Sequence, residues 1–488
     1  MEKIIADGKR FIDSFGRERI FNGLNVCDKG IYNEKTKKRD YGTLWHKGLA
    51  KELKEKGFNL IRLGLIWDAI EPQKGQYNQE YIDFICSILD ECEKEGIFVY
   101  LDMHQDLYSG FGDGCGDGAP EWACLTDKYK YHKALFVWAE GYFWGRAVHR
   151  AFDNFWNNVK GVQDDYLDMW SHIAETAGQK DSVIGYDVMN EPFPGKSGGK
   201  IFRKIITNLV KTTITDSSIS KSKLVKYALS SENRHKVLDL YGGEQLRKVT
   251  SAADALVKKF DTERYFPFIS KSAEALEKIN DKILIIENCY FSNLGIPCST
   301  PIPEKNGENI KNAVFAPHAY DFMVDTPSYK YANNHRIKAI FDEHKRTQDR
   351  MNIPVIVGEW GGFTEGNEWF HHIKFLLELF DSNKWSQTYW AYFNGILEGD
   401  VTTEVLCRPY PAAVTGRIIG YRHDRDNDTF TLSYEQEKEY DSETEIYIHK
   451  PYKEIITDGE VSEEKINDKA SILKIKTDIG TNTIKVIF

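Results

Sequence analysis

The sequence predicts an α/β fold, a (β/α)8 TIM barrel followed by a small antiparallel β-domain. Eight short runs rich in apolar and β-branched residues recur over roughly 400 residues, and helix-like stretches separate them. Several runs, such as IFVYLDMH and IPVIVGEW, are almost continuously apolar, which is typical of parallel strands buried on both faces. Near the C-terminus the apolar pattern changes to a period of two, which indicates strands with one solvent-facing side.

The eight runs give the expected order of the barrel strands. Between the second and third runs, YIDFICSILDECEKEG places Tyr81, Ile88 and Leu89 at helical spacing, and Gly96 is the expected C-cap. An open, doubly wound sheet is the competing topology, and it is disfavoured because no GxGxxG motif follows an early strand. The expected strands are 21–25, 60–67, 97–104, 183–191, 283–290, 313–321, 353–360 and 386–393.

The strand pattern divides the chain into two expected domains. Residues 1–412 should form the barrel, and residues 413–488, with segments such as TFTLSYE and NTIKVIF, a β-sandwich-like domain. The RPYP segment at 408–411 suggests that this domain docks tightly on the barrel. Residues 195–280, after the fourth strand, are too many for a simple crossover and should overhang the active-site face. They are interpreted as a lid or substrate-gripping loop, with a passive insertion as the alternative.

Composition narrows the class of protein. Of 488 residues, 41% are hydrophobic and 28% charged, which is typical of a globular chain. The formal net charge of −10 disfavours nucleic acid as a partner, because phosphate backbones attract basic surfaces. Aromatic residues reach 13%, which permits the stacking of rings on sugar faces without proving it.

The sequence also bears on location and redox state. No run reaches about 18 apolar residues, so no membrane-spanning helix is expected. The first residues lack the apolar core of a secretory signal, so the protein is expected in the cytoplasm, or secreted if a cleaved signal preceded this sequence. The eight cysteines form no paired CxxC units, which disfavours a zinc site. Cys115 with Cys124, and Cys289 with Cys298, could pair in an oxidising compartment; free thiols are the alternative.

Polar residues end most of the expected strands. In a TIM barrel the carboxyl ends of the strands face the active site, and a charge there is costly unless it has a partner. Because six polar strand ends converge on one barrel mouth, we expect them to form an active site rather than to serve only the packing of the barrel. The candidates are Arg62, His104, Asp106, Asn190, Glu191, His318, Tyr320, Glu359 and Trp390.

Glu191 and Glu359 are the central pair. They end the fourth and seventh strands, on opposite sides of the mouth, and two carboxyl groups facing across a cleft suit glycoside hydrolysis. One would protonate the leaving oxygen while the other, held ionised by Arg62, attacks the anomeric carbon. Asn190 could bond the sugar 2-hydroxyl, and Tyr320 could donate to the nucleophile. A salt-bridged rim without catalysis is the structural alternative.

The residues around both glutamates resemble a known family. VIGYDVMNEPF with Glu191 and IPVIVGEWG with Glu359 are similar to the acid/base and nucleophile motifs of retaining β-glycosidases in glycoside hydrolase family 5. YLDMHQDLYSG, GDGAPEWA, RAFDNFW and RPYPAAVTG resemble the endoglycoceramidase branch in particular. Those enzymes release an intact oligosaccharide from ceramide. The resemblance covers most of the chain except the segment 195–280.

The resemblance implies roles for individual residues. Glu191 would be the general acid/base and Glu359 the nucleophile, with Arg62, Asn190, His318 and Tyr320 in support. The sugar beside the scissile bond would be held by hydroxyl contacts and stacking from His104, Asp106, Trp390, Trp156 and Lys29. The family needs no metal or organic cofactor, so none is expected. A glycosphingolipid or related glycolipid is the expected partner, met at a membrane or micelle surface, and no protein partner is inferred.

Ceramide has two long apolar tails, so an apolar groove is expected on the aglycone side. The aromatic stretch FVWAEGYFW at 136–144 and the loop after Glu359 are candidates; packing of the stretch under the third-strand loop is the alternative. Two other functions stay open. One is an exo-acting β-glucosidase or β-galactosidase on monosaccharide lipids such as glucosylceramide or steryl glucoside. The other is a catalytically silent glycolipid-binding protein, which the presence of both glutamates disfavours.

Overall fold

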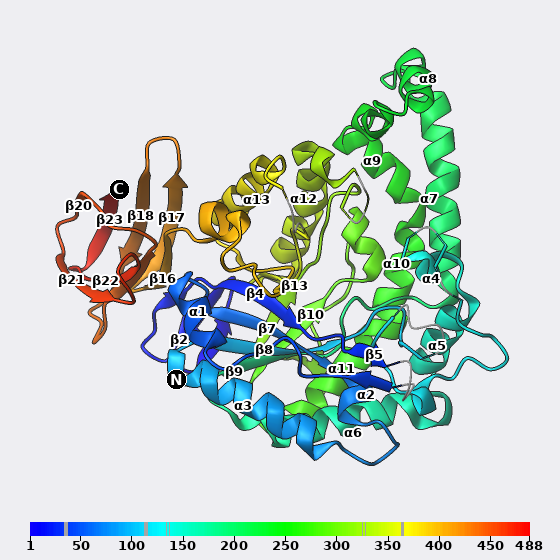
Figure 1. Cartoon of the computed structure of the whole chain (residues 1–488), viewed down its shortest axis with the longest axis horizontal. Coiled ribbons are helices and arrows are strands. Elements are labelled where there is room, and N and C mark those ends of the chain that lie inside the picture. Colours follow the sequence, from blue (N-terminus) through cyan, green and yellow to red (C-terminus); the bar gives the residue numbers. More distant parts are fainter. Residues whose placement is uncertain are drawn as a thin grey trace.

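The structure is a computed structural model that describes residues 1–33, 38–111, 116–132, 134–135, 137–324, 326, 328–362 and 366–488. It shows a barrel flanked on one side by a β-domain and on the other by a projecting helical arm (Figure 1). The predicted fold class is confirmed. In the part of the chain that is described, no helix combines the length and apolarity needed to cross a membrane.

Eight parallel strands form the barrel in the order β13-β10-β9-β8-β7-β4-β15-β14. A parallel bridge between Phe315 and Val355 brings the two ends of this sheet together and closes the barrel. Each strand falls within or overlaps one of the predicted runs. They are β4 (Asn22–Cys27), β7 (Leu60–Ile66), β8 (Phe98–His104), β9 (Val183–Asp187), β10 (Ile283–Glu287), β13 (Ala313–Ala316), β14 (Ile356–Val357) and β15 (Ser386–Tyr389).

Helices surround this sheet. In α3 (Gln79–Glu95), the Asn78 side chain accepts a hydrogen bond from the Tyr81 N–H at the N-terminus, and Gly96 at φ 76° ends the helix as predicted. The other helices around the barrel are α1 (Leu49–Glu55), α2 (Trp67–Ile70), α4 (Glu140–Trp144), α5 (Arg146–Trp156), α6 (Val162–Glu175), α11 (Phe266–Leu276), α12 (Asn334–Met351) and α13 (Phe370–Asn383). Two short hairpins, β5 (Ile31–Asn33) with β6 (Lys38–Asp40) and β11 (Glu304–Lys305) with β12 (Glu308–Asn309), lie in the loops.

The N-terminal strands β1 (Ile4–Asp7), β2 (Arg10–Asp13) and β3 (Glu18–Arg19) link the two parts of the molecule. Ile4 and Phe11 pack with Phe21 and Phe98 from the amino ends of barrel strands, so the β1–β2 hairpin covers the bottom of the barrel. At the same time β3 pairs with β16 (Tyr410–Val414). From the sequence these residues are expected in the barrel alone, because local periodicity does not reveal a strand's distant partner.

Two antiparallel sheets form the C-terminal β-domain. One has the order β1-β2-β3-β16-β19-β22-β21 and the other β17-β18-β23-β20. Burial alternates residue by residue along β18 (Thr429–Gln436), as its period-two pattern predicts. Arg408, just before β16, forms a buried two-bond ion pair with Asp381 of α13. The remaining strands are β17 (Arg417–Asp424), β19 (Thr444–Ile448), β20 (Glu454–Ile456), β21 (Glu460–Lys465), β22 (Ser471–Lys476) and β23 (Gly480–Ile487).

The long segment after β9 is helical. It begins with α7 (Lys196–Thr215) and α8 (Lys221–Leu229), which extend away from the barrel on the side opposite the C-terminal β-domain (Figure 1). The chain then returns through α9 (Gly243–Thr250) and α10 (Asp254–Phe260) to α11. The His235 ring stacks on Tyr331 with centroids 3.5 Å apart, and Asn333 and Arg336 both contact Asp239, so the returning segment is tied to the start of α12.

Candidate active site

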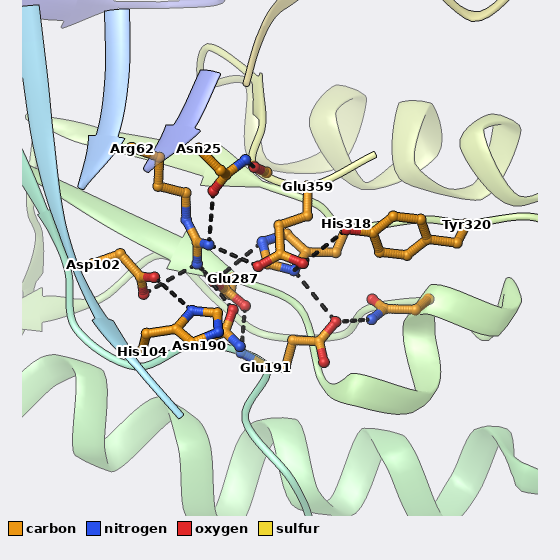
Figure 2. A network of polar contacts seen from close by, with 12 residues as sticks. Asn25, Arg62, Asp102, His104, Asn190, Glu191, Glu287, His318, Tyr320 and Glu359 are labelled. Carbon is orange, nitrogen blue, oxygen red and sulfur yellow. Dashed lines mark hydrogen bonds and ion pairs between the residues drawn. The ribbon is translucent and has the colours of Figure 1, made fainter. Parts of the chain in front are cut away.

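The predicted polar residues meet at the carboxyl ends of the barrel strands (Figure 2). Glu191 follows β9 and Glu359 follows β14, and parallel bridges join His318 to Glu359 and Gly361 to Trp390 along the same edge. A carboxylate oxygen of Glu191, one of Glu359 and a ring nitrogen of His318 all lie within 4.8 Å of one another. Carboxyl groups about 5–5.5 Å apart are typical of retaining glycosidases, whereas inverting enzymes leave about 6.5–9.5 Å for a water molecule.

Glu359 is held from both sides. Arg62 Nη1 donates to its Oε1 at 2.7 Å, and the Tyr320 hydroxyl donates to its Oε2 at 2.9 Å. The side chain is 7% exposed, so it faces the mouth without being fully solvated. Each oxygen of the Glu359 carboxyl group therefore has its own donor, a buried guanidinium on one side and a hydroxyl group on the other.

Glu191 has a different environment. Its Oε1 accepts from Asn293 Nδ2 at 2.6 Å and lies 3.3 Å from His318 Nδ1. Burial raises the pKa of Glu191 to about 7; repulsion from Glu359 acts in the same direction, while His318 opposes it. A carboxyl group that titrates near neutral pH can both give and take a proton. The two glutamates thus lie in different electrostatic environments, one beside Arg62 and the other buried beside Asn293 and His318.

The backbone at Glu191 adopts φ 44°, which is uncommon for a residue with a side chain. Its N–H donates to Glu287 Oε2 at 2.6 Å, and Gln105 Nε2 donates to the carbonyl of the preceding Asn190 at 2.9 Å. These bonds hold the sharp turn that directs the Glu191 side chain towards His318 and Asn293.

Arg62, on β7, lies at the centre of the network. Its guanidinium contacts carboxylates on three neighbouring strand ends, Asp102 at 3.1 Å, Asp187 at 3.1 Å and Glu287 at 2.8 Å, besides Glu359. It also donates to the side-chain oxygens of Asn25 at 3.2 Å and Asn190 at 2.9 Å. Arg62 is 1% exposed, so these partners supply the charge compensation that burial demands.

His318 adds a second buried basic group. Its Nε2 lies 3.2 Å from Glu287 Oε1, and its Nδ1 lies 3.3 Å from Glu191 and 3.7 Å from Glu359. Burial would lower the pKa of His318, but the charges of Glu287 and Glu359 outweigh this effect and raise it well above the usual value. His318 therefore spans both candidate catalytic carboxylates.

A second polar group lies beside this centre. His104 Nδ1 contacts Asp102 Oδ2 at 2.9 Å, and its ring stacks on Trp390 with centroids 5.2 Å apart. Lys29 Nζ contacts Asp106, lies 3.5 Å from Asp117 and sits 5.0 Å from the centre of the Trp390 ring. An aromatic face next to charged hydrogen-bonding groups is suited to a sugar, which offers an apolar face and hydroxyl groups.

Asn190 and Trp156 differ in how the structure places them. The Asn190 Nδ2 donates to the Gln105 carbonyl at 3.0 Å, which within the described chain is its one acceptor, and the contact with a sugar hydroxyl stays a prediction. Trp156 does not join the group, contrary to expectation. Its Nε1 donates to the Phe193 carbonyl at 2.8 Å, and its ring packs against Phe260 and Phe268. The aromatic cluster between α5 and α11 takes it into the core.

Glu287, Asn293 and Asp117 belong to the site although the sequence analysis did not select them. Glu287 ends the apolar run ILIIE, so the rule applied to the other strands could have found it. Asn293 lies in the turn after β10, and Asp117 pairs in an antiparallel bridge with Asp106 across a loop. No periodic signal marks either of these two positions.

Three clusters in the described chain have the spacing of metal ligands: His104 with Asp106 and Asp117, Glu191 with His318 and Glu359, and Asp102 with Asp187 and Glu287. In two of them a side-chain cation already lies among the carboxylates, Lys29 in the first and Arg62 in the third. In the second, the imidazole of His318, whose pKa is raised, supplies the positive charge. The sequence-based expectation of no cofactor stays a prediction.

The expected apolar groove can be traced in part. A cavity of about 360 Å³ opens beside the third-strand loop and is lined mainly by apolar side chains, among them Leu107, Phe111, Trp144 and Val148. Phe136, residues 363–365 after Glu359 and Cys115 lie outside the described residues. The seven described cysteines, Cys289 and Cys298 included, are free thiols.

Family models match both parts of the chain. Cellulase (glycosyl hydrolase family 5) matches residues 23–217 and 267–395, and the glycoside hydrolase family 5 C-terminal domain matches residues 408–486. The chain therefore belongs to glycosyl hydrolase family 5, which confirms the resemblance drawn from its motifs.

Individual proteins similar to this chain include enzymes that act on glycolipids. An endoglycoceramidase of Cyanea nozakii is 36% identical over 209 residues, which cover 38% of this chain and 41% of that protein. A glucosylceramidase of Cryptococcus neoformans var. grubii is 25% identical over 252 residues, which cover 40% and 34%. The chain thus spans about two fifths of the length of the curated relatives that it matches. Endo-glycoceramidase II from Rhodococcus sp., solved as a ganglioside GM3 complex, shares the fold with a TM-score of 0.74 at 21% identity over 99% of both chains.

Proposed function

We propose that this protein is a retaining glycoside hydrolase that cleaves the β-glycosidic bond between the glycan and the ceramide of glycosphingolipids. One observation carries the proposal. Two buried carboxyl groups face each other within 4.8 Å, one paired with Arg62 and Tyr320 and the other with a pKa raised to about 7. This is the asymmetric pair that double displacement needs.

The reaction has two steps. A carboxylate oxygen of Glu359 attacks the anomeric carbon while Glu191 donates its proton to the glycosidic oxygen, so the C–O bond to ceramide breaks and ceramide leaves as an alcohol. Glu191, now ionised, takes a proton from water, whose oxygen displaces Glu359 and releases the glycan. Arg62 stabilises Glu359 as it leaves, and the sugar stacks on Trp390 beside Lys29, His104 and Asp106.

A ceramide aglycone is supported by the relatives and by the cavity. The endoglycoceramidase of Cyanea nozakii is 36% identical over 209 residues, and the apolar cavity lies beside the loop that follows His104. Because the two alkyl chains of ceramide stay in lipid, the enzyme should meet its substrate at a membrane or micelle surface. Both a cytoplasmic and a secreted location are compatible with this role.

An exo-acting glucosidase on monosaccharide lipids is the second candidate. Relatives named glucosylceramidase, and an ergosteryl-β-glucosidase of Saccharomyces cerevisiae at 41% identity over 73 residues, favour it. The two functions differ in whether the cleft beyond the first sugar is open.

The test is incubation of the protein in mild detergent with glucosylceramide, galactosylceramide, lactosylceramide and a ganglioside in equal amounts, with products identified by mass spectrometry. Intact lactose or ganglioside glycan together with ceramide is the expected result. Glucose or galactose alone would replace the proposal with the exo-acting function. Binding without any product would indicate a silent glycolipid-binding protein.

A further inference from the structure

The segment formed by α7, α8 and their linker, residues 196–229, is unlike the rest of the molecule in charge. We call it the basic arm. It contains eight Lys and Arg residues and a single Asp, a net charge of +7 in a chain whose net charge is −10. On α7, Lys200, Lys204 and Lys211 are exposed, and within the described chain none of them forms an ion pair with a carboxylate.

The helix α7 has two apolar sides. Ile201 is fully buried, and Leu209 packs against a small cluster of Ile219, Tyr241 and Leu246. On the other side, Ile206, Val210 and Ile214 recur every four residues and so form one stripe along the helix. Their side chains are 42%, 54% and 70% exposed. A helix on a protein surface needs only one apolar side, the one that packs on the protein, so the exposed side of α7 requires another explanation.

Further apolar side chains are exposed at both ends of the arm. On α8, Val225 and Leu229 are 57% and 82% exposed. At the base of α7, the Phe202 ring packs on Phe143 and lies 5.9 Å from Trp144, which is itself 57% exposed. Trp144 also lines the apolar cavity beside the third-strand loop. The apolar surface therefore runs from the arm to the cavity considered for ceramide.

We propose that the basic arm is an interfacial docking element, which lays the stripe of Ile206, Val210 and Ile214 into the surface of a bilayer rich in anionic lipid. Apolar residues on one face with lysines beside them are the composition of helices that lie in the membrane–water interface. Charge complementarity favours a lipid surface over a second copy of the chain as the binding partner of the stripe. Anionic headgroups attract the basic arm, whereas in a symmetric dimer two basic arms would face and repel each other. The lysines bind lipid phosphates and carboxylates, and Trp144 lies at headgroup depth.

The arm is firmly attached to the candidate active site. It begins at Lys196, five residues after Glu191, and the residue before it, Gly195, has φ 56° and packs against Asp153. Asp153 Oδ1 accepts from the Lys196 N–H at 3.1 Å. Docking of the arm would thus bring the barrel mouth close to lipid. The inference deepens the proposed function and rests on it for the identity of the substrate, but lipid binding itself is measured without substrate.

The experiment is co-sedimentation of the full chain with phosphatidylcholine vesicles, with and without phosphatidylserine and free of glycolipid. The expected result is binding that needs phosphatidylserine and weakens as salt rises. In the triple variant Ile206→Ser, Val210→Ser, Ile214→Ser, affinity should fall at least about tenfold. In the triple variant Lys200→Ser, Lys204→Ser, Lys211→Ser, the affinity for vesicles with phosphatidylserine should fall about a hundredfold.

The matched control is Ile419→Ser, Ile456→Ser, Ile479→Ser, which removes three isoleucines that are 49%, 50% and 56% exposed in the C-terminal β-domain. Its vesicle affinity should equal that of the wild type. All variants should keep wild-type turnover of a soluble aryl glycoside, which shows that they fold. Equal affinity of the arm variants and the wild type would overturn the proposal. The proposal would also be overturned if the wild type were a dimer and the Ile206, Val210, Ile214 triple variant were a monomer with unchanged vesicle binding, because the stripe would then be a dimer interface. Vesicle binding without glycolipid cleavage would refute the proposed function and leave the arm's role standing.

Discussion

At the scale of single residues, the site separates two glutamates by environment. Glu359 lies between Arg62 and Tyr320, which stabilise its charge, and Glu191 lies in a buried position that favours the proton. The signal for both residues was in the sequence, because each ends an apolar strand. Asn293 and Asp117 had no such signal, since loop residues reach the site only through the folding of β10 and of the third-strand loop.

Substitution of each glutamate tests the assignment. In Glu359→Gln, turnover of both lactosylceramide and an aryl glycoside with a good leaving group should fall by at least about a thousandfold, because no nucleophile remains. In Glu191→Gln, lactosylceramide turnover should fall by about 10²–10⁴-fold. The first step with the aryl substrate, in which Glu359 becomes glycosylated, should persist because the aryl leaving group needs no proton. Initial rates and burst kinetics measure both effects. Near-wild-type aryl activity of Glu359→Gln would show that the nucleophile is another residue.

The raised pKa of Glu191 predicts the pH dependence of the reaction. The acid must be protonated to act, and its pKa of about 7 lies above the ordinary value of 4.5. The kcat/KM for lactosylceramide should therefore stay high on the acid side and fall by about tenfold per pH unit above pH 7. Glycosylation by an aryl glycoside with a good leaving group should lack this decline. An alkaline limb near pH 4.5 would contradict the environment described for Glu191.

At the scale of elements, the N-terminal hairpin shows what periodicity misses. No strand was expected before residue 21, and the position of β1 and β2 below the barrel and of β3 beside β16 depends on contacts hundreds of residues away. Helix α3 shows the opposite case, because its C-cap Gly96 and its apolar face are local and were predicted from the sequence.

Phe11 tests the hairpin's contribution to stability. Its ring lies 5.3 Å from Phe21 within the cluster below the barrel, and it is 3% exposed. We expect Phe11→Ala to lower the free energy of unfolding by about 3–5 kcal/mol, because it leaves a cavity. Phe15→Ala, which removes a ring that is 52% exposed, is the matched control and should change it little. Urea denaturation measures both, and equal stabilities would mean that the hairpin does not cover the core.

At the scale of the whole molecule, we propose that residues 1–412 act as the catalytic barrel and that the C-terminal β-domain has a structural role. Strand β3 pairs with β16, and the buried Arg408–Asp381 pair joins α13 to the start of the domain. Two parts connected in this way should unfold together. Calorimetry of the wild type should show one cooperative transition, and two well-separated transitions would contradict the proposed coupling.

The ion pair between the parts can be tested by itself. Arg408→Met and Asp381→Leu should each destabilise the protein by about 3–5 kcal/mol, because each leaves one buried charge without its partner. The double variant should recover most of this loss, since two apolar side chains can pack there. Thermal unfolding of the four proteins measures the cycle. Additive losses in the double variant would show that the pair does not couple the two parts.

The sequence by itself determined the barrel, the order of its strands and the residues at their ends, because these features depend on local periodicity and on one rule about parallel strands. The contacts of Arg62 and Tyr320 with Glu359 were also expected, but only the tertiary structure decided the other polar contacts of the site. In the structure Glu287 accepts a hydrogen bond from the Glu191 N–H, Arg62 lies among four carboxylates, and Trp156 is buried in an aromatic cluster. The physical reason is that pairing and burial are properties of side chains distant in sequence. Their contacts form, and their pKa values shift from the ordinary ones, only once the barrel has closed.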